Sequence, residues 1–231
     1  MTVARAGAVV TLTLARPERR NALDRALLSD LTATLAELGD DRTTRAIVLT
    51  GAPPVFSAGA DLGRGSDMPS PPGQFVRLFS RLAATLERLE LPVVAALNGH
   101  AVGGGWALAL GCDFRLAAES AQCWVPEIDL GVALHPVLAT PFVRLVGPAR
   151  TREIAMEGRR YSAAEQHAMG LVHRVVPAAA LPAAAADYAA HLAAKPPRAL
   201  AEVKARINQI ARAAWPEVGA TTEGVLDRPA G

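Results

Sequence analysis

This chain of 231 residues is poor in several residue types that mark particular classes of protein. Its two cysteines, Cys112 and Cys123, stand in apolar surroundings and are too few for a disulfide framework, so buried reduced thiols are expected. Lysine occurs only at Lys195 and Lys204, and the many arginines are scattered along the chain. Scattered arginine indicates a solvated surface, and a nucleic-acid-binding face is disfavoured.

Long apolar runs are also missing. No segment approaches the ~20 uninterrupted apolar residues that a membrane-spanning helix needs. The first twenty residues lack the apolar stretch and the small-residue cleavage site of a signal peptide. These two absences predict a cytoplasmic protein. The five histidines show no metal-ligand spacing, so no metal is expected.

What the chain does have is enough apolar sequence for one large domain with a sizeable core. Hydrophobic residues make up 51% of the chain, and the net charge is only +2. Strands are predicted at 9–14, 45–51, 92–99 and 113–119, and helices at 21–41 and 74–90. In the helix predicted over 21–41, Asn21 or Asp24 can cap the start, and Gly39 is expected to follow the end. This alternation predicts an α/β layered fold over 1–177, followed by a helical, alanine-rich region over 178–231.

Three consecutive glycines at 103–105 stand where the next helix should begin. The first amides of a helix have no partner within it, and the helix dipole makes that end partly positive. Glycine removes the side chains that would keep a ligand atom from these amides. The segment "FSAGAD" at 56–61 offers a second glycine-flanked turn. Two such backbone donors could form an oxyanion hole, although each segment alone is better explained as an ordinary tight turn. The glycine spacing matches neither a dinucleotide fingerprint nor a Walker loop.

Five segments, in this order and spacing, resemble the crotonase family, the enoyl-CoA hydratase/isomerase enzymes. They are "LARPERRNAL" (14–23), "IVLTGAPPVFSAGADL" (47–62), "NGHAVGGGWALALGCDFRLAAESA" (98–121), "VPEIDLG" (125–131) and "AMEGRRYSAAEQHAMGLVHRVVP" (155–177). The resemblance implies the ClpP/crotonase fold, a superhelix of repeated ββα units with a helical C-terminal oligomerisation region, here shortened. It also implies acyl-CoA thioester substrates, no cofactor apart from the coenzyme A of the substrate, and a homotrimer or a hexamer built as a dimer of trimers.

Carried over residue by residue, the resemblance assigns a set of site residues. The amides of Ala60 and Gly104 would hold the thioester oxygen, and Glu127 would act as acid/base. The turn that contains Ala58, Asp61 and Leu62, together with Ala60 and Gly104, would bind the coenzyme A arm. Hydratases of this family use two glutamates, and the position of the first is Ala107 here.

A second acid/base is an open question at the level of sequence. His135 follows Glu127 by eight residues, where related isomerases carry an aspartate, and it is either a proton carrier or a structural histidine at a helix start. Asp129 is a weaker candidate. Trp106 and Trp124 replace residues that are commonly small, and each could fill part of the acyl pocket.

Two functions remain open on this basis. The leading prediction is an enoyl-CoA hydratase or isomerase with Glu127 as acid/base. The alternative is an acyl-CoA-binding protein of the same fold that has lost or altered catalysis, because Ala107 replaces the first glutamate. A Clp-type serine protease is disfavoured, because the helix start offers Gly103 to Gly105 and no nucleophilic serine.

Overall fold

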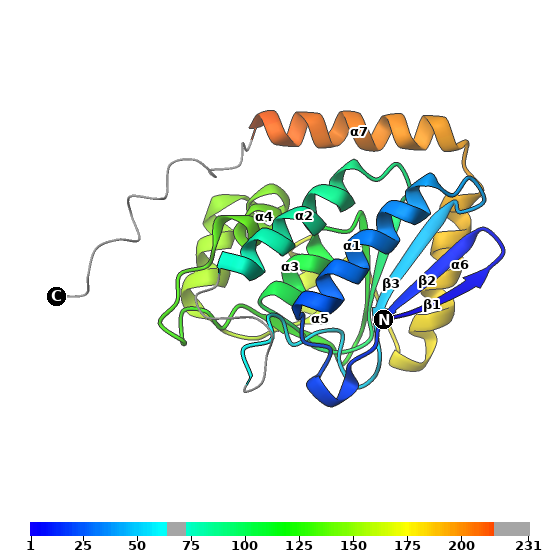
Figure 1. Ribbon diagram of the computed structural model, residues 1–231. Coiled ribbons are helices and arrows are strands. Elements are labelled where there is room, and N and C mark those ends of the chain that lie inside the picture. The colour runs from blue at the N-terminus through cyan, green and yellow to red at the C-terminus, as the bar shows by residue number, and fades with distance from the viewer. Residues whose placement is uncertain (64–72, 215–231) are drawn as a thin grey trace.

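The computed structural model describes residues 1–63 and 73–214, and its centre is a six-stranded sheet in the order β1-β2-β3-β4-β6-β9 (Figure 1). An antiparallel hairpin of β1 (Thr2–Ala6) and β2 (Val9–Leu14) forms one edge. From β2 onward the neighbours are parallel: β3 (Ala46–Gly51), β4 (Val93–Leu97), β6 (Phe114–Ala118) and β9 (Arg174–Val176). The central strand β4 is buried at every position, as expected for a parallel strand covered on both faces.

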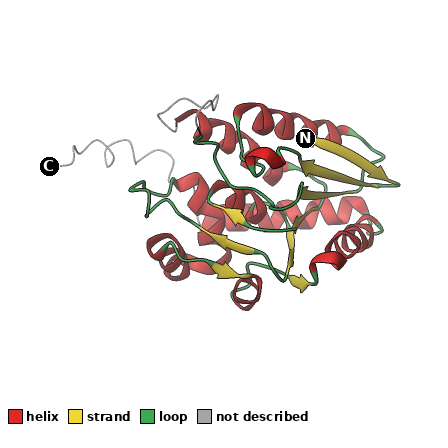
Figure 2. Ribbon diagram, turned by 90° about the horizontal axis from the view of Figure 1, so that it is seen from below, coloured by secondary structure: helices red, strands yellow, loops and turns green. Residues whose placement is uncertain are grey.

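A smaller sheet holds together the parts of the chain that follow the main strands. It consists of β5 (Ala101–Val102), β7 (Gln122–Trp124) and β8 (Tyr161–Ser162), with β7 in the middle. Figure 2 shows the strands running between the surrounding helices. Because β5 follows β4 directly and leads into the next helix, this small sheet fixes where that helix starts.

Helices cover both faces of the main sheet (Figure 1). On one side α1 (Arg25–Asp40) packs against α2 (Gly73–Arg88), and on the other α6 (Leu181–Ala193) contacts β2, β3, β4 and β6. The short α3 (Gly104–Leu110) packs against α4 (Pro136–Glu157), which is interrupted at Gly147, where φ is 71°. The remaining helices are α5 (Ala163–Ala168), α7 (Pro197–Ala214) and the 3-10 turns Pro17–Arg19 and Ala178–Ala180. The predicted α/β architecture is confirmed, with ββα units visible in β1-β2-α1, β4-β5-α3 and β6-β7-α4.

Several details differ from the sequence prediction. Gly39 was expected to follow the end of α1, but it lies inside the helix, which continues to Asp40. A Cβ at Gly39 would come within 2.9 Å of Leu89 Cδ1, so this glycine allows a close approach of the residue that follows α2. Asp24, one of the two proposed caps, is the N-cap, and its side chain accepts a hydrogen bond from the Leu27 amide at 2.8 Å. The strands β1, β7, β8 and β9 were not predicted.

The two cysteines have the surroundings that the sequence predicts. Cys112 and Cys123 are both free and buried, and burial raises the pKa of each thiol to about 12. Within residues 1–63 and 73–214, no helix combines the length and the apolar character needed to cross a membrane. In the same residues, histidine, cysteine, aspartate and glutamate form no cluster of three or more suited to a metal ion.

Candidate functional site

The two glycine-containing segments predicted to supply backbone donors lie against each other. Ser57 pairs with Ala101 in a parallel bridge, and the Val102 amide donates to the Ser57 carbonyl oxygen at 3.0 Å. The contact is so close that a Cβ at Gly105 would lie 2.7 Å from that same oxygen. Gly59 has a φ of +83°, and a Cβ there would lie 2.5 Å from the Val102 carbonyl oxygen. Gly59 and Gly105 are therefore needed for the two backbone segments, 56–61 and 101–105, to contact each other.

This contact places the amides of Ala60 and Gly104 on neighbouring segments. Gly104 is the first residue of α3, and its N-cap has no side chain to accept from it. The amides on either side of Ala60 are both engaged: Gly59 N donates to Ser57 Oγ at 3.2 Å, and Asp61 N donates to Leu23 O at 3.1 Å. Neither the Ala60 nor the Gly104 amide donates a hydrogen bond to any residue that the structure describes. A Cβ on Gly104 would stand 3.8 Å from Ala60 N, so a ligand oxygen could approach both donors.

Glu127 lies beside this pair, in the turn that follows β7. The Gly103 amide donates to the carbonyl of Trp124 at 2.9 Å, which ties the end of β7 to the start of α3. The Glu127 carboxylate then packs onto Gly103, where a Cβ would come within 2.7 Å of Oε1. Its Oε2 is buried and has no hydrogen-bond partner among the described residues. Burial raises the pKa of Glu127, as expected for a carboxylate that would act as an acid/base near neutral pH.

The sequence left open whether His135 is a proton carrier or a structural residue, and the structure shows a structural contact. It is the N-cap of α4, and its Nδ1 accepts a hydrogen bond from the Val137 amide at 3.2 Å. The ring is half-buried, and burial lowers its pKa, which favours the neutral form. No hydrogen bond joins it to Glu127 in the part of the chain that the structure describes. Asp129 packs on Gly158, where a Cβ would lie 2.8 Å from its Oδ2.

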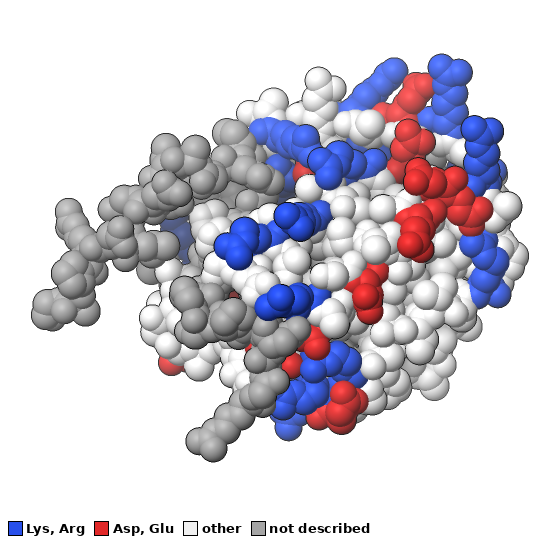
Figure 3. All heavy atoms as spheres, viewed as in Figure 1, with Lys and Arg blue, Asp and Glu red and all other residues white. Residues whose placement is uncertain are grey.

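The turn predicted to bind coenzyme A borders a hollow. It has a volume of about 270 Å³ and is lined by Ala60, Asp61, Leu62 and Gly63 on one side and by Glu18, Arg19, Arg20 and Ala22 on the other. Leu62 is exposed, while the Ala58 amide is already bonded to the Arg20 carbonyl at 2.9 Å. Basic and acidic side chains lie together at the lower edge of the molecule in Figure 3, where Figure 1 places the 3-10 turn Pro17–Arg19. The hollow is thus lined by two arginines and two carboxylates, with Arg19 paired to Asp61.

Asp61 organises this turn from within. Its carboxylate is buried and accepts from Arg19 Nη2 at 2.7 Å and from Arg16 Nη1 at 3.0 Å. Burial alone would raise the pKa of Asp61, but hydrogen bonds from Arg19, the Gly63 amide and Arg16 outweigh it and hold the pKa below its usual value. Asp61 therefore fixes the shape of the turn and holds two arginines beside it.

We expect Asp61→Asn to lower the free energy of unfolding by about 1–3 kcal/mol at pH 7, because it breaks a buried ion pair with partly exposed partners. The folded-state pKa lies below the unfolded value, so this contribution is complete above the ordinary aspartate range and is lost as pH falls through the lowered pKa. Urea unfolding at a series of pH values measures it. Asp30→Asn, at an exposed position of α1, is the control. A difference between Asp61→Asn and wild type that does not shrink at acidic pH would contradict this account.

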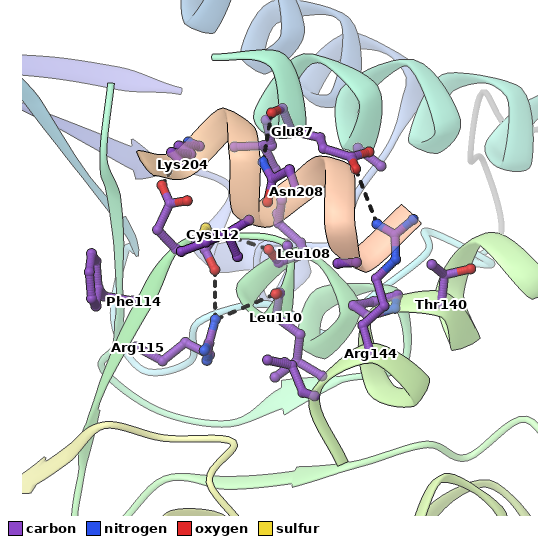
Figure 4. A pocket seen from close by; sticks show the side chains of 18 of the residues that line it. Glu87, Leu108, Leu110, Cys112, Phe114, Arg115, Thr140, Arg144, Lys204 and Asn208 are labelled. Carbon is purple, nitrogen blue, oxygen red and sulfur yellow. Dashed lines mark hydrogen bonds and ion pairs between the residues drawn. The ribbon is translucent and has the colours of Figure 1, made fainter. Parts of the chain in front are cut away.

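Ala107, Trp106 and Trp124, the residues that depart from the family pattern, lie in three different environments. Ala107, one turn after Gly104, is buried and lines a cavity of about 490 Å³ among α2, α3, α4 and α7 (Figure 4). Trp106 lies in the core, edge-on to Phe142 at 4.9 Å between ring centroids and 5.9 Å from Tyr161. Trp124 contacts His100 and lies under the Arg160 guanidinium. Neither tryptophan lines the two hollows described here.

Phe75 is the residue at this site that the sequence prediction missed. It sits in the first turn of α2, far from the glycines in sequence, yet its Cζ lies 2.9 Å from the position of a Cβ on Gly104. Its helical spacing with Phe79, Leu82 and Leu86 indicated a core residue, and it is buried. Only the packing of α2 against α3 shows that it borders the free amides.

Comparison with known proteins shows the family. A family model described as enoyl-CoA hydratase/isomerase matches residues 4–228. A Mycobacterium tuberculosis protein named probable enoyl-CoA hydratase echA8 is 37% identical over 170 residues, which cover 72% of this chain and 65% of that protein. The chain thus spans slightly less than two thirds of that relative. The short-chain-enoyl-CoA hydratase of Clostridium acetobutylicum is 33% identical over 205 residues, covering 88% of this chain and 78% of the relative.

Solved structures agree. The crystal structure of a monofunctional enoyl CoA isomerase from M. smegmatis superposes with a TM-score of 0.80 at 31% identity, covering 92% of this chain and 94% of the other. The family model's match over residues 4–228 includes the glycine-rich start of α3 and the turn that carries Glu127. This chain belongs to the enoyl-CoA hydratase/isomerase family and has the crotonase fold.

Proposed function

We propose that this protein acts on acyl-CoA thioesters and that the Ala60 and Gly104 amides form the oxyanion hole. One observation carries the proposal: a buried carboxylate with a raised pKa, Glu127, lies beside two backbone amides without partners among the described residues. Amides aimed at the thioester oxygen stabilise the negative charge that develops when a proton leaves the α-carbon, and each is worth about 3 kcal/mol in the transition state. The positive end of α3 adds to this stabilisation.

The chemistry that a single carboxylate supports best is migration of a double bond. Glu127 would take a proton from C2 of a 3-enoyl thioester, and the electron pair would delocalise onto the thioester oxygen held by the two amides. Return of the same proton to C4 gives the 2-enoyl product, so no other reactant is consumed. Hydration would need a second group to hold and deprotonate water, and Ala107 cannot supply it. Family membership leaves hydration as the other reaction of this site.

The coenzyme A arm would lie in the hollow between the Ala60–Gly63 turn and Arg19–Arg20. Exposed main chain suits an adenine ring, and guanidinium groups suit phosphates. No cofactor apart from this substrate moiety is part of the proposal. Ala58 and Asp61 would act by shaping the turn, because the Ala58 amide and the Asp61 carboxylate are engaged within the protein.

A panel of 2-enoyl- and 3-enoyl-CoA substrates followed by absorbance of the conjugated thioester tests the reaction. We expect absorbance to rise with 3-enoyl-CoA, as the double bond moves into conjugation. A fall with 2-enoyl-CoA would instead identify hydration. Tight binding of an acyl-CoA in calorimetry without either change would support the alternative, an acyl-CoA-binding protein, to which Ala107 at the first glutamate position points. Absence of both binding and turnover would refute the proposal.

The proposed assembly is a homotrimer or a dimer of trimers. Exposed apolar side chains in the turn after Glu127, namely Ile128, Leu130 and Val132, together with Met156, offer surface that a subunit contact would cover. We expect equilibrium sedimentation to give three or six times the mass of the chain. A monomer at micromolar concentration would contradict this assembly.

A further inference from the structure

His100 lies where the two segments that supply the free amides meet. It stands between β4 and β5, and its main-chain carbonyl accepts hydrogen bonds from the amides of Phe56 at 3.0 Å and Ser57 at 3.2 Å. Those two residues open the segment that carries the Ala60 amide. After His100 the chain passes through β5 to the Gly104 amide at the start of α3. The main chain of His100 thus joins both halves of the proposed oxyanion hole.

The ring of His100 holds a third part of the site, the strand β7. Its Nδ1 accepts a hydrogen bond from the amide of Gln122, the first residue of β7, at 3.1 Å. The His100 carbonyl already accepts two bonds from the segment 56–61, so the ring nitrogen supplies an acceptor that the main chain does not have to spare. The bond requires an unprotonated Nδ1, and the neutral ring therefore carries its proton on Nε2.

Side-chain contacts continue along β7 from this bond. The His100 ring meets the Trp124 ring edge-on, with the centroids 5.8 Å apart, and the Arg160 guanidinium lies 4.4 Å from the centroid of the same ring. His100 directly precedes β5 and Arg160 directly precedes β8, and these are the two neighbours of β7 in the small sheet. The indole on β7 is thus contacted from both neighbouring strands.

The position of β7 decides where Glu127 lies. The strand β5 has only two residues, Ala101 and Val102, so its ladder with β7 is short. Beyond that ladder the Gly103 amide donates to the Trp124 carbonyl at 2.9 Å, and Glu127 follows Trp124 by three residues. A shift of β7 therefore moves the Glu127 carboxylate and turns the first amides of α3. A displacement of about 1 Å from the productive geometry can slow a reaction about 100-fold.

We propose that His100 is a positioning residue of this site: its ring fixes β7, and through β7 the Glu127 carboxylate, against the two segments that supply the free amides. The inference rests on the proposed function, which it deepens by naming what sets the geometry between the acid/base and the backbone donors. His100 itself touches neither the thioester nor coenzyme A, and acts through Gln122 and Trp124.

Two substitutions of similar size test the ring nitrogen. His100→Leu places a methyl group where Nδ1 stood and leaves the Gln122 amide without its acceptor, whereas His100→Asn keeps an acceptor, Oδ1, at the same number of bonds from the main chain. In His100→Leu we expect kcat for enoyl-CoA to fall about 10- to 100-fold, while KM and the calorimetric affinity for coenzyme A stay within about threefold of wild type. In His100→Asn kcat should return to within about fivefold of wild type.

His173→Leu is the matched control. His173 Nδ1 also accepts a main-chain amide, that of Arg115, at 3.1 Å, but this bond lies at β6, outside the small sheet and outside the segments that form the site. Its loss should lower the melting temperature to a similar extent, yet leave kcat within about threefold of wild type. An equal fall of kcat in His173→Leu and His100→Leu would overturn the positioning role of His100.

The carbonyl stretch of a bound thioester reports the geometry of the donors without turnover. The probe is saturated butyryl-CoA labelled with carbon-13 at the thioester carbonyl and observed by infrared difference spectroscopy. Hydrogen bonds from the two amides should lower the stretching frequency on binding to wild type. In His100→Leu this lowering should shrink by about half or more, and in His100→Asn and His173→Leu it should match wild type.

The outcomes separate this inference from the proposed function. A wild-type frequency that does not change on binding would refute the oxyanion hole itself. A wild-type shift that His100→Leu retains, together with an unchanged kcat, would overturn the role of His100 while the oxyanion hole stands. If circular dichroism shows that His100→Leu does not fold, nitrogen NMR of histidine-labelled wild type decides, with the His100 signals assigned by their absence in His100→Asn. A proton on Nε2 supports the bond to Gln122, and a proton on Nδ1 contradicts it and the proposal with it.

Discussion

Glu127→Gln is expected to lower kcat/KM for enoyl-CoA by about 10²- to 10⁴-fold, the usual contribution of a positioned acid/base. Glutamine has nearly the same shape, so it still fits against Gly103, where a Cβ would lie 2.7 Å from Oε1 of the carboxylate. What it loses is the ability to accept and return a proton. Affinity for coenzyme A should stay near wild type, because the hollow at Ala60–Gly63 is untouched. Steady-state kinetics and calorimetry measure the two quantities, and turnover within tenfold of wild type would remove Glu127 from the mechanism.

The same substitution should not cost stability. Because burial raises the pKa of Glu127 in the folded protein, the folded state holds this proton more tightly than the unfolded state does. Stability is therefore lost as pH rises from the unfolded-state pKa through the raised folded-state pKa, and glutamine, which cannot ionise, avoids that loss. The melting temperature of Glu127→Gln at pH 7 should equal or exceed that of wild type. An inactive but stable variant separates a chemical role from a structural one.

The pH dependence of wild-type kcat/KM follows from the same shift. The base form of Glu127 is required, and it exists above the folded-state pKa. Burial moves that pKa upward, so the acidic limb of the profile should lie above the ordinary glutamate value of about 4.3. In Glu127→Gln the residual activity should lack this limb. A wild-type limb at or below the ordinary value would show that another group limits the rate.

The sequence predicted most of the regular structure because that information is local. Leu27, Leu28, Leu31, Leu35 and Leu38 recur at helical spacing, and all five are buried in α1. The strand β1 was missed because its residues, TVARA, are all exposed, so no buried alternation marks it. Gly39 was misassigned because a glycine near a helix end usually serves as a C-cap, whereas here it makes room for Leu89, fifty residues away.

In the candidate site too, the sequence predicted the features that depend on local signals and missed those that depend on distant contacts. Glycine runs and the "VPEIDLG" turn are local signals, so Gly104 and Glu127 could be named from the sequence. The facing of Ala60 and Gly104, the packing of Glu127 on Gly103 and the position of Phe75 all depend on contacts between distant segments. Burial decides the pKa of Glu127, and burial is a property of the assembled fold. The role predicted for His135 as proton carrier is untested, and its observed contact is the cap of α4.

Gly103→Ala is expected to disable the site because the added Cβ strains the backbone and also contacts Glu127. Gly103 has φ 48° and ψ −117°, a backbone conformation that an L side chain adopts only at a cost of about 1–3 kcal/mol. The new Cβ would also meet Glu127 Oε1 at 2.7 Å, which pushes the carboxylate away from the α3 amides. We expect kcat/KM to fall at least 100-fold and the free energy of unfolding to fall by about 2–4 kcal/mol. Enzyme kinetics and urea unfolding measure the two losses.

Gly170→Ala separates the two effects. Gly170 also has a positive φ, +79°, but a Cβ there meets nothing within 4 Å, so this variant adds backbone strain without a contact to Glu127. It should lose stability by a similar strain cost yet keep kcat/KM within about threefold of wild type. The difference in activity between the two alanine variants then measures what the position of the Glu127 carboxylate contributes. Equal activities would mean that the carboxylate can leave Gly103 without consequence, and the juxtaposition that carries the proposed function would have no catalytic meaning.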